Sequence, residues 1–324
     1  MHYKKISPDL PESSNLAFGC SGIAGRVSAK QSIAVIKTAL DSGITHFDVA
    51  PSYGYGEAEA CLGKAVSTHR QQIVIATKVG IVSSYSSNVI KAFKPLAQKT
   101  IAIFPWMRNI VAKSANIAGK TLMRSPISYQ QMKISIEKSL TDLKTDYIDI
   151  LFLHEYLKED LSLELIEQLE AIKKEGKIRT YGLATQIETI NYAEILGYPN
   201  LLSQFSNNIL LKNENKIHNK NGVYITHSTF ACLERIQKII TNHKNALCSF
   251  GLWPLKTKEV CELMLSYAVQ INKRGLVICS MLNKSHLEKN IATLKNPRFS
   301  NEQVLAFSNI ICRHQNETHQ SISP

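Results

Sequence analysis

Three short apolar stretches of this sequence carry an ionisable side chain within them or at their ends, namely Asp48, Lys78 and His154. A tyrosine, Tyr53, follows the first stretch. Taken singly, these residues have structural explanations. Asp48 and Lys78 could form a buried ion pair, and His154 could be a hydrogen-bonded core histidine, because buried polar groups rarely stay unpaired. Taken together, a carboxylate, a phenol, an ammonium and an imidazole form a set that can transfer protons.

The segments that must position these side chains alternate regularly along the chain. Short runs that are apolar almost throughout predict eight strands, at 16–19, 44–50, 73–79, 147–154, 178–184, 201–206, 222–228 and 275–281. Such runs suit parallel strands that are covered by helices. Eight strands alternating with helices fit a (β/α)8 barrel or an open doubly wound sheet, and counting alone does not decide between them. In a barrel, the carboxyl ends of the strands form the active face.

The segments between the strands carry the 3.6-residue apolar period of helices. Ser28 and Ser128 stand where N-caps are expected, and Gly43 is suited to end the first helix. The run Gly54-x-Gly56 predicts a tight turn that leads into a helix over 57–66. It is not a dinucleotide-binding fingerprint, because no third glycine follows at the required spacing.

Three of these segments together resemble the aldo-keto reductase superfamily. They read F-D-x-A-x-x-Y-G followed by G-E-x-E-x-x-L-G, then A-T-K-V-G, then I-D-I-L-F-L-H. The similarity runs from about residue 16 to residue 154, continues through Gly176-Lys177-Ile178-Arg179 and Gly182, and is weaker in the last third. The residues around the tyrosine are most similar to the branch that contains bacterial aldose and fucose/galactose dehydrogenases. The resemblance implies a (β/α)8 TIM barrel, a nicotinamide nucleotide bound without a Rossmann fold, and a catalytic tetrad at Asp48, Tyr53, Lys78 and His154.

The chemistry of these four side chains agrees with the implied reaction, which interconverts a carbonyl and an alcohol by hydride transfer. Carbonyl reduction needs a proton donor as hydride arrives, and a free tyrosine, with a pKa of about 10, releases its proton reluctantly. We expect the Lys78 ammonium to lower the pKa of Tyr53 and Asp48 to keep that lysine charged. His154, as a neutral donor, would orient the substrate oxygen. In the oxidising direction Tyr53 would act as the base.

The expected cofactor contacts depart from the family pattern. The usual Ser-Asn pair that holds the carboxamide is replaced by Ala184-Thr185, and His227 stands where many members place a tyrosine under the nicotinamide. The resemblance predicts cofactor-binding residues at Ala184, Thr185, Gln204, His227, Ser280, Lys284, His286 and Asn290.

The segment expected to bind an adenosine 2′-phosphate leaves the choice of nucleotide open. Residues 280–286 contain one lysine and no arginine. Arginine is the preferred bidentate phosphate ligand, so this composition weakens the case for NADPH without excluding it. NADP(H) and NAD(H) are both candidate cofactors. The seven cysteines include no C-x-x-C pair and give no support for a metal site, and we expect no metal.

An insertion at about 83–127, after the third strand, concentrates the positive charge of the chain. It supplies seven of the twelve net positive charges and no acidic residue: Lys91, Lys94, Lys99, Arg108, Lys113, Lys120 and Arg124. Barrel geometry places its root at the catalytic face, so we expect a lid that attracts anionic substrates. A solvated face or a docking surface for an acidic partner fits the same charge. No recognised nucleic-acid motif accompanies it, and its four aromatics do not make a stacking platform, so we expect no nucleic-acid ligand.

The remaining composition is that of one globular domain. The chain is 44% hydrophobic and 20% charged, and no apolar run approaches the ~18–20 residues that span a bilayer. The polar N-terminus lacks the apolar core of a signal peptide, and the scattered cysteines fit a reducing compartment. We therefore expect a cytoplasmic, single-domain barrel over residues 1–324, with a frayed tail from about residue 313 and no transmembrane segment.

The main functional hypothesis is an NAD(P)(H)-dependent oxidoreductase that acts on a small polar aldehyde, ketone or sugar, and the basic insertion favours anionic compounds of this class. The alternative is a nicotinamide-binding barrel that serves as a regulatory or scaffold subunit with little turnover. The altered carboxamide site favours the alternative, whereas the complete tetrad opposes it.

Overall fold

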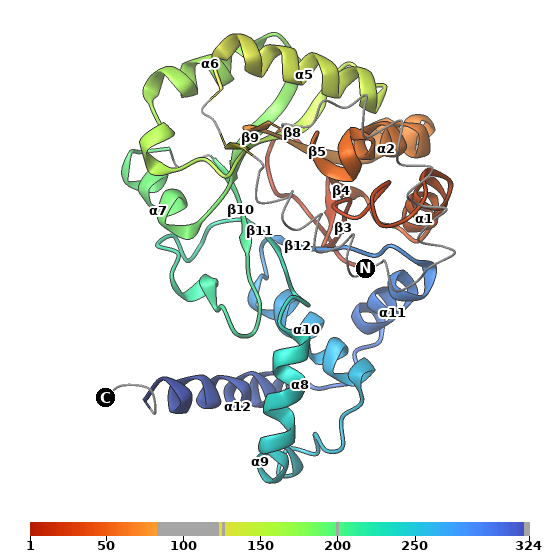
Figure 1. The fold of residues 1–324 in the computed structure, drawn as a ribbon, viewed down its shortest axis with the longest axis vertical. Coiled ribbons are helices and arrows are strands. Elements are labelled where there is room, and N and C mark those ends of the chain that lie inside the picture. Colours follow the sequence, from red (N-terminus) through yellow and green to blue (C-terminus); the bar gives the residue numbers. More distant parts are fainter. Residues whose placement is uncertain (83–122, 125–126, 199–200, 321–324) are drawn as a thin grey trace.

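A closed barrel of eight parallel strands forms the centre of the computed structural model, which describes residues 1–82, 123–124, 127–198 and 201–320 (Figure 1). The strands are β3 (Leu16–Gly19), β4 (His46–Asp48), β5 (Val74–Val79), β8 (Ile148–His154), β9 (Ile178–Ala184), β10 (Leu202–Ser206), β11 (Tyr224–His227) and β12 (Leu276–Cys279). Each strand pairs with the next along the chain, and β12 closes on β3. All eight predicted strands are found, and their closure selects the (β/α)8 barrel over the open sheet.

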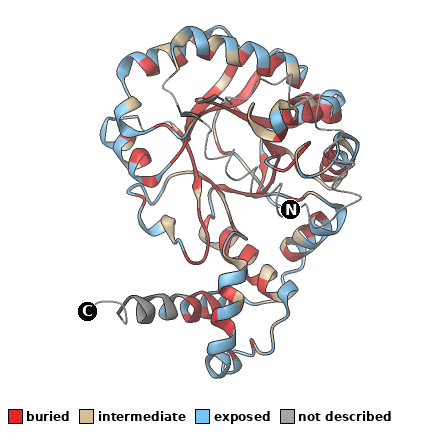
Figure 2. Cartoon of the chain, viewed as in Figure 1, coloured by how far each residue is buried: buried red, intermediate tan, exposed pale blue. Residues whose placement is uncertain are grey.

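The barrel strands are buried on both faces, which explains why their sequences are apolar almost throughout (Figure 2). One set of side chains fills the interior of the barrel, including Val74, Ala76, Ile150, Phe152 and Leu202. The alternate residues face the surrounding helices and join the larger core between the helices and the barrel. A polar side chain at the inner carboxyl end of a strand therefore stands out against an apolar background.

Helices flank the barrel: α1 (Ala29–Asp41), α2 (Ala58–Val66), α5 (Tyr129–Leu143), α6 (Leu163–Lys174), α7 (Ile187–Ile195), α10 (Thr257–Ile271) and α11 (Lys284–Lys295). Ser28 and Ser128 are N-caps as predicted, and each forms a capping box with the glutamine three residues later. Gly43 follows the first helix with φ of +91°, a left-handed conformation that glycine adopts easily.

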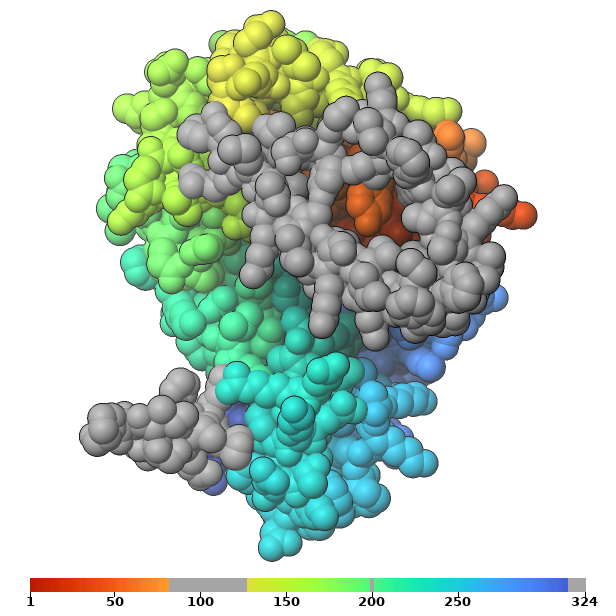
Figure 3. Space-filling model, viewed as in Figure 1, coloured from red at the N-terminus to blue at the C-terminus, as the bar shows by residue number. Residues whose placement is uncertain are grey.

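A helical lobe extends from the side of the barrel, at the bottom of the view in Figure 3. It consists of α8 (Leu233–Asn242), α9 (Lys244–Cys248) and α12 (Asn301–Gln320), which pack with α10 around their own apolar cluster. The fraying of the tail from about residue 313 stays a prediction. Among the described residues, no helix combines the length and the apolar character needed to cross a bilayer.

The root of the basic insertion is a two-stranded ribbon directly after β5. Strand β6 (Ile81–Val82) pairs antiparallel with β7 (Met123–Arg124), so the two ends of the insertion lie side by side. Residues 83–122 and 125–126 lie outside the described residues, and with them all the predicted basic residues of the insertion except Arg124. The lid and the acidic-partner surface therefore stay predictions.

The N-terminal segment covers the opposite end of the barrel, and a buried ion-pair cluster lies near the start of β8. Between β1 (Tyr3–Lys4) and β2 (Ser13–Ser14), Ile6 and Leu10 pack against the barrel interior. Asp149, near the start of β8, accepts from the guanidinium groups of Arg70 at 2.7 Å and Arg179 at 3.0 Å. Short 3-10 helices complete the chain at Tyr53–Gly56, Ser67–Gln72, Lys158–Asp160 and Asn213–Asn215.

Candidate active site

The strand register brings three of the four candidate residues to the same end of the barrel. Asp48 ends β4, Lys78 is the penultimate residue of β5, and His154 ends β8. These strands are neighbours, with Asp48 opposite Ala76 and Lys78 opposite Phe152. Their carboxyl ends therefore converge, as the sequence predicts for a barrel.

Asp48 and Lys78 form a buried, tightly paired unit. The Lys78 ammonium donates to both carboxylate oxygens of Asp48 at 2.7 Å and to the carbonyl oxygen of Val49 at 3.0 Å. The exposed fractions of Lys78 and Asp48 are only 3% and 4%. Although burial alone would lower the pKa of Lys78, the carboxylate of Asp48 raises this pKa above its usual value. Lys78 is therefore a fixed positive charge.

Tyr53 is placed beside this pair by a tight turn. It opens the 3-10 helix Tyr53–Gly56, in which Gly54 has φ of +59°. A Cβ atom at Gly54 would lie 2.2 Å from the carbonyl oxygen of Ile23, so only glycine fits at this position. The predicted tight turn and the helix that follows it, α2, are confirmed. The residue type at position 54 thus determines where the phenol of Tyr53 can lie.

The tyrosine, lysine and histidine side chains meet at this end of the barrel. The Lys78 nitrogen lies 5.2 Å from the centroid of the Tyr53 ring. The rings of Tyr53 and His154 stand edge to face, with centroids 6.4 Å apart. The structure therefore brings together all four residues that the sequence singles out.

Burial dominates the proton affinities around the ion pair. Burial and the charge of Lys78 lower the pKa of His154 to about 3, so its imidazole is neutral at pH 7. Burial raises the pKa of Tyr53, and Lys78 acts in the opposite direction. The expected lowering effect of Lys78 on the pKa of Tyr53 is present, but burial raises this pKa by more, so the net change is a rise.

The three central cofactor candidates lie on or directly after the two strands that follow β8. Ala184 ends β9 opposite Gln204 of β10, and both residues are buried. The Gln204 amide nitrogen donates to Asp48 Oδ2 at 2.8 Å. The Thr185 hydroxyl donates to the carbonyl oxygen of Tyr156 at 2.6 Å, so its only proton is already committed to the protein. Gln204 is the one side chain of the three that joins the ion pair.

The remaining cofactor candidates are more dispersed. His227 ends β11, its Nδ1 atom lies 2.8 Å from the Ser228 hydroxyl, and burial lowers its pKa to about 4. Ser280 is exposed, and its hydroxyl lies 3.1 Å from that of Ser21. Lys284 and His286 are exposed in the first turn of α11, and Asn290 is half-buried further along it.

Two buried polar atoms near the ion pair lack a hydrogen-bond partner among the described residues, namely Gln204 Oε1 and His154 Nδ1. Buried polar atoms are almost always paired in folded proteins, so these atoms mark places where groups of a ligand fit. A carboxamide NH2 is a suitable donor for Gln204 Oε1. This end of the barrel therefore fits a nicotinamide ring.

Residues 15–231 of the sequence match the Aldo/keto reductase family. The chain belongs to this family. Its match covers the barrel from β3 to β11 and includes the four candidate catalytic residues.

Curated relatives and solved structures agree with the family. The aldo-keto reductase YhdN of Bacillus subtilis is 30% identical over 193 residues, which cover 57% of this chain and 47% of that protein. The D-threo-aldose 1-dehydrogenase of a Pseudomonas species is 25% identical over 179 residues, covering 53% of this chain and 50% of that protein. The chain thus spans about half the length of these curated relatives. The holo structure of the aldo-keto reductase AKR11C1 from Bacillus halodurans has a TM-score of 0.70, 20% identity and 96% coverage of both chains.

Two contributions to the site were not predicted from the sequence. The carbonyl of Val49 accepts from Lys78, and the amide of Gln204 donates to Asp48. The first involves a backbone group, which any residue type would supply. The second joins positions 156 residues apart, and the only signal for it is the polar Gln204 within an otherwise apolar strand.

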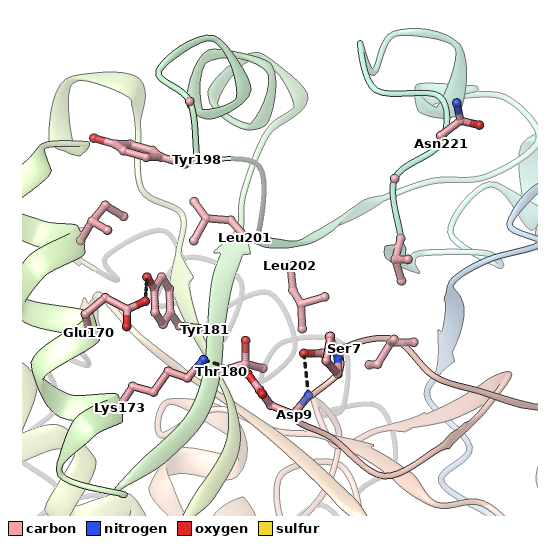
Figure 4. Close-up of a pocket in the computed structure, with 16 residues that line it drawn as sticks. Ser7, Asp9, Glu170, Lys173, Thr180, Tyr181, Tyr198, Leu201, Leu202 and Asn221 are labelled. Atoms are coloured by element: carbon pink, nitrogen blue, oxygen red, sulfur yellow. Dashed lines mark hydrogen bonds and ion pairs between the residues drawn. The ribbon is translucent and has the colours of Figure 1, made fainter.

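A cavity of about 660 Å³ lies away from these residues, at the amino-terminal ends of β9, β10 and β11 (Figure 4). The charged side chains that line it have partners within the protein. Lys173 forms an ion pair with Asp9 at 2.8 Å, and Glu170 accepts a hydrogen bond from the Tyr181 hydroxyl at 2.6 Å. None of the four tetrad candidates lines it. The candidate catalytic residues therefore lie apart from this cavity, at the ion-pair end of the barrel.

Proposed function

We propose that this chain is an NAD(P)(H)-dependent oxidoreductase that interconverts a carbonyl and an alcohol by hydride transfer, with Tyr53 as the general acid and base. The observation that carries the proposal is the buried Asp48–Lys78 pair beside the phenol of Tyr53 and the ring of His154. Burying a pair of charges is costly, and here the ammonium of the pair lies next to a phenol whose ionised form it favours.

The residues that would hold the nicotinamide are Gln204, through its free Oε1, and His227, through the face of its ring. When bound, the nicotinamide would supply hydride to a carbonyl carbon or accept it from an alcohol. Neither Ala184 nor the committed proton of Thr185 adds a side-chain donor for its carboxamide. The nucleotide is thus bound more weakly than in family members with the full Ser-Asn pair. Both NAD(H) and NADP(H) are compatible with the exposed Lys284 and His286.

Tyr53 moves the proton. In reduction, its Oη–H donates to the substrate oxygen as negative charge develops there, and Lys78 stabilises the phenolate that remains. In oxidation, the phenolate takes the hydroxyl proton. Asp48 holds the ammonium in place and keeps it charged.

His154 orients the substrate oxygen without exchanging its own proton. Because its pKa is lowered to about 3, the ring is a neutral hydrogen-bond donor throughout the physiological pH range. Tyr53 and His154 would thus contact the same oxygen from two sides, which selects one orientation of the carbonyl.

The substrate class we propose is a small polar aldehyde, ketone or sugar-like hydroxyl compound. The polar character of the tetrad end and the similarity to a relative named D-threo-aldose 1-dehydrogenase support this class. Steering of anionic substrates by the basic insertion stays a prediction, since that segment lies outside the described residues.

The test is a screen of aldehydes, ketones, polyols and aldoses with NADH, NADPH, NAD⁺ and NADP⁺, read by the absorbance of the reduced nicotinamide. We expect turnover of at least one small polar compound, with modest preference between the two nucleotides. Tight nucleotide binding without turnover of any compound would instead support the regulatory or scaffold barrel.

A further inference from the structure

Gln204 is the only described side chain besides Lys78 that donates a hydrogen bond to Asp48. Its exposed fraction is 2%, and its Nε2 lies 2.8 Å from Asp48 Oδ2, the oxygen that Lys78 also contacts at 2.7 Å. The carboxylate of Asp48 is therefore held from two sides, by β5 and by β10. Because β10 lies across the barrel from β4, this bond joins strands that are not neighbours in the sheet.

The orientation of the Gln204 amide follows from chemistry. A carboxylate only accepts hydrogen bonds, so the NH2 group must face Asp48 and the carbonyl oxygen must face the other way. That oxygen is buried and has no partner in the described part of the chain. Gln204 thus has one end in the ion pair and one end open to a ligand donor.

We propose that Gln204 is a positioning residue that couples occupation of the nicotinamide site to the Asp48–Lys78 pair. The inference rests on the proposed function. A donor received at Oε1 polarises the amide and strengthens the bond that Nε2 makes to Asp48, because chained hydrogen bonds reinforce one another. A bound carboxamide would then hold Asp48, and through it Lys78 and Tyr53, more firmly than the empty site does.

Coupling of this kind is reciprocal. If the carboxamide strengthens the Gln204–Asp48 bond, then Asp48 must strengthen the binding of the nicotinamide, even without touching it. The nicotinamide contribution is measured as the ratio of the Kd of ADP-ribose, which lacks the ring, to the Kd of NAD⁺. Both nucleotides share the same adenosine and pyrophosphate contacts, so those contacts cancel in the ratio.

The experiment is a double-mutant cycle on this ratio, with Asp48→Asn, Gln204→Met and the double variant, followed by calorimetry. Asp48→Asn also changes the charge near the ring directly, and that direct effect persists in the Gln204→Met background. We expect the effect of Asp48→Asn on the ratio to be at least about fivefold smaller when Gln204 is absent. Equal effects in the two backgrounds would overturn the coupling.

Ser203→Ala is the matched control. Ser203 is the buried neighbour of Gln204 on β10, and its side chain lies on the opposite face of the strand. It should leave the Kd ratio unchanged. If Ser203→Ala moved the ratio as much as Gln204→Met does, the effect would come from β10 as a whole and the positioning role would be wrong.

The pH profile of alcohol oxidation gives a second readout. With the Asp48–Lys78 pair held less firmly, the phenolate of Tyr53 is stabilised less, so the alkaline rise in rate should move upward by about half a pH unit or more in Gln204→Met. Ser203→Ala should keep the wild-type profile. An unshifted profile in Gln204→Met would contradict the role of Gln204 in the ion pair.

A replacement variant and the binding of wild type distinguish failure of the coupling from failure of the proposed function. If Gln204→Met does not fold, Gln204→Leu also removes the amide donor with an apolar side chain of similar size, and the same changes are expected. A wild-type chain that binds neither NAD⁺ nor NADP⁺ would overturn the proposed function. If the wild-type chain binds the nucleotide and turns over a substrate, but the effects of Asp48→Asn and Gln204→Met on the Kd ratio are additive, only the coupling is overturned.

Discussion

The imidazoles of His154 and His227 lie near the Asp48–Lys78 pair, and both are neutral at pH 7. Burial removes the hydration that an imidazolium needs, and the positive charge of Lys78 disfavours it further. The pKa values of about 3 and about 4 place their titration well below the physiological range. A neutral imidazole can donate a hydrogen bond but is a poor acid at pH 7, which supports the proposed role of Tyr53 as the acid.

This assignment predicts how the rate of carbonyl reduction depends on pH. Between pH 5 and pH 8, kcat/KM should show no ionisation that belongs to His154, because the ring is neutral throughout. The measurement is a pH profile for wild type and for His154→Gln. A limb near pH 6.5 that disappears in the variant would show that His154 is protonated during catalysis.

The affinity for the nucleotide also depends on single residues. The side chain of Ala184 has no hydrogen-bond donor, and the Thr185 hydroxyl already donates its proton to the carbonyl oxygen of Tyr156. Ala184→Ser should therefore tighten nucleotide binding by up to about fivefold, the equivalent of one net hydrogen bond of ~1 kcal/mol. Calorimetry with NAD⁺ and NADP⁺ measures this. Unchanged binding of both nucleotides would show that the carboxamide does not reach residue 184.

At the scale of elements, β8 connects two ends of the barrel with different tasks. Its carboxyl end presents His154, whereas Asp149 near its start joins Arg70 and Arg179 and also accepts from the backbone of Ile75 at 2.9 Å. The two guanidinium groups lie 4.0 Å from the centroid of the Tyr147 ring. The strand is thus anchored at one end by this cluster, while its other end presents a candidate catalytic residue.

Removal of the anchor should destabilise the fold. Asp149→Ala leaves the buried guanidinium of Arg70 without its anion, which costs about 3–5 kcal/mol in the free energy of unfolding. The control is Asp9→Ala, which breaks the exposed Lys173–Asp9 pair and should cost no more than about 1 kcal/mol. Urea unfolding measures both variants. Equal losses would mean that the Asp149 cluster contributes no more than a surface pair.

Elements were predictable from the sequence where one physical rule dominates. Strands buried on both faces are apolar throughout, and the predicted run 44–50 contains β4 even though the strand itself covers only His46–Asp48. N-caps at Ser28 and Ser128 follow from side-chain chemistry alone. The Gln204–Asp48 bond was not predictable, because it depends on how far side chains reach across the closed barrel. The net rise in the pKa of Tyr53 depends on burial, which a local sequence does not report.

At the scale of the whole molecule, three buried neutral histidines make stability depend on pH. Burial lowers the pKa of His46 to about 4, of His154 to about 3 and of His227 to about 4. Each folded pKa lies below the unfolded value of about 6.5, so the unfolded chain binds more protons between these values. Their contribution to stability is therefore complete above about pH 6.5 and is lost as the pH falls toward 4.

The free energy of unfolding should accordingly fall between pH 6 and pH 5, with a slope that approaches about 4 kcal/mol per pH unit for three histidines. Denaturant unfolding at several pH values gives this slope. His227→Gln should reduce it by about a third. A flat dependence over this range would mean that the three rings are protonated in the folded protein.

The central claim is that a phenol activated by the Asp48–Lys78 pair carries turnover. Tyr53→Phe keeps the ring and removes only the reacting hydroxyl, so the fold and nucleotide binding should persist. Tyr55→Phe, at the exposed tyrosine two residues later, is the matched control and should keep the wild-type rate. With the best substrate from the screen, kcat of Tyr53→Phe should fall by at least about 100-fold, the usual contribution of a positioned acid. Turnover by Tyr53→Phe at nearly the wild-type rate would contradict the account.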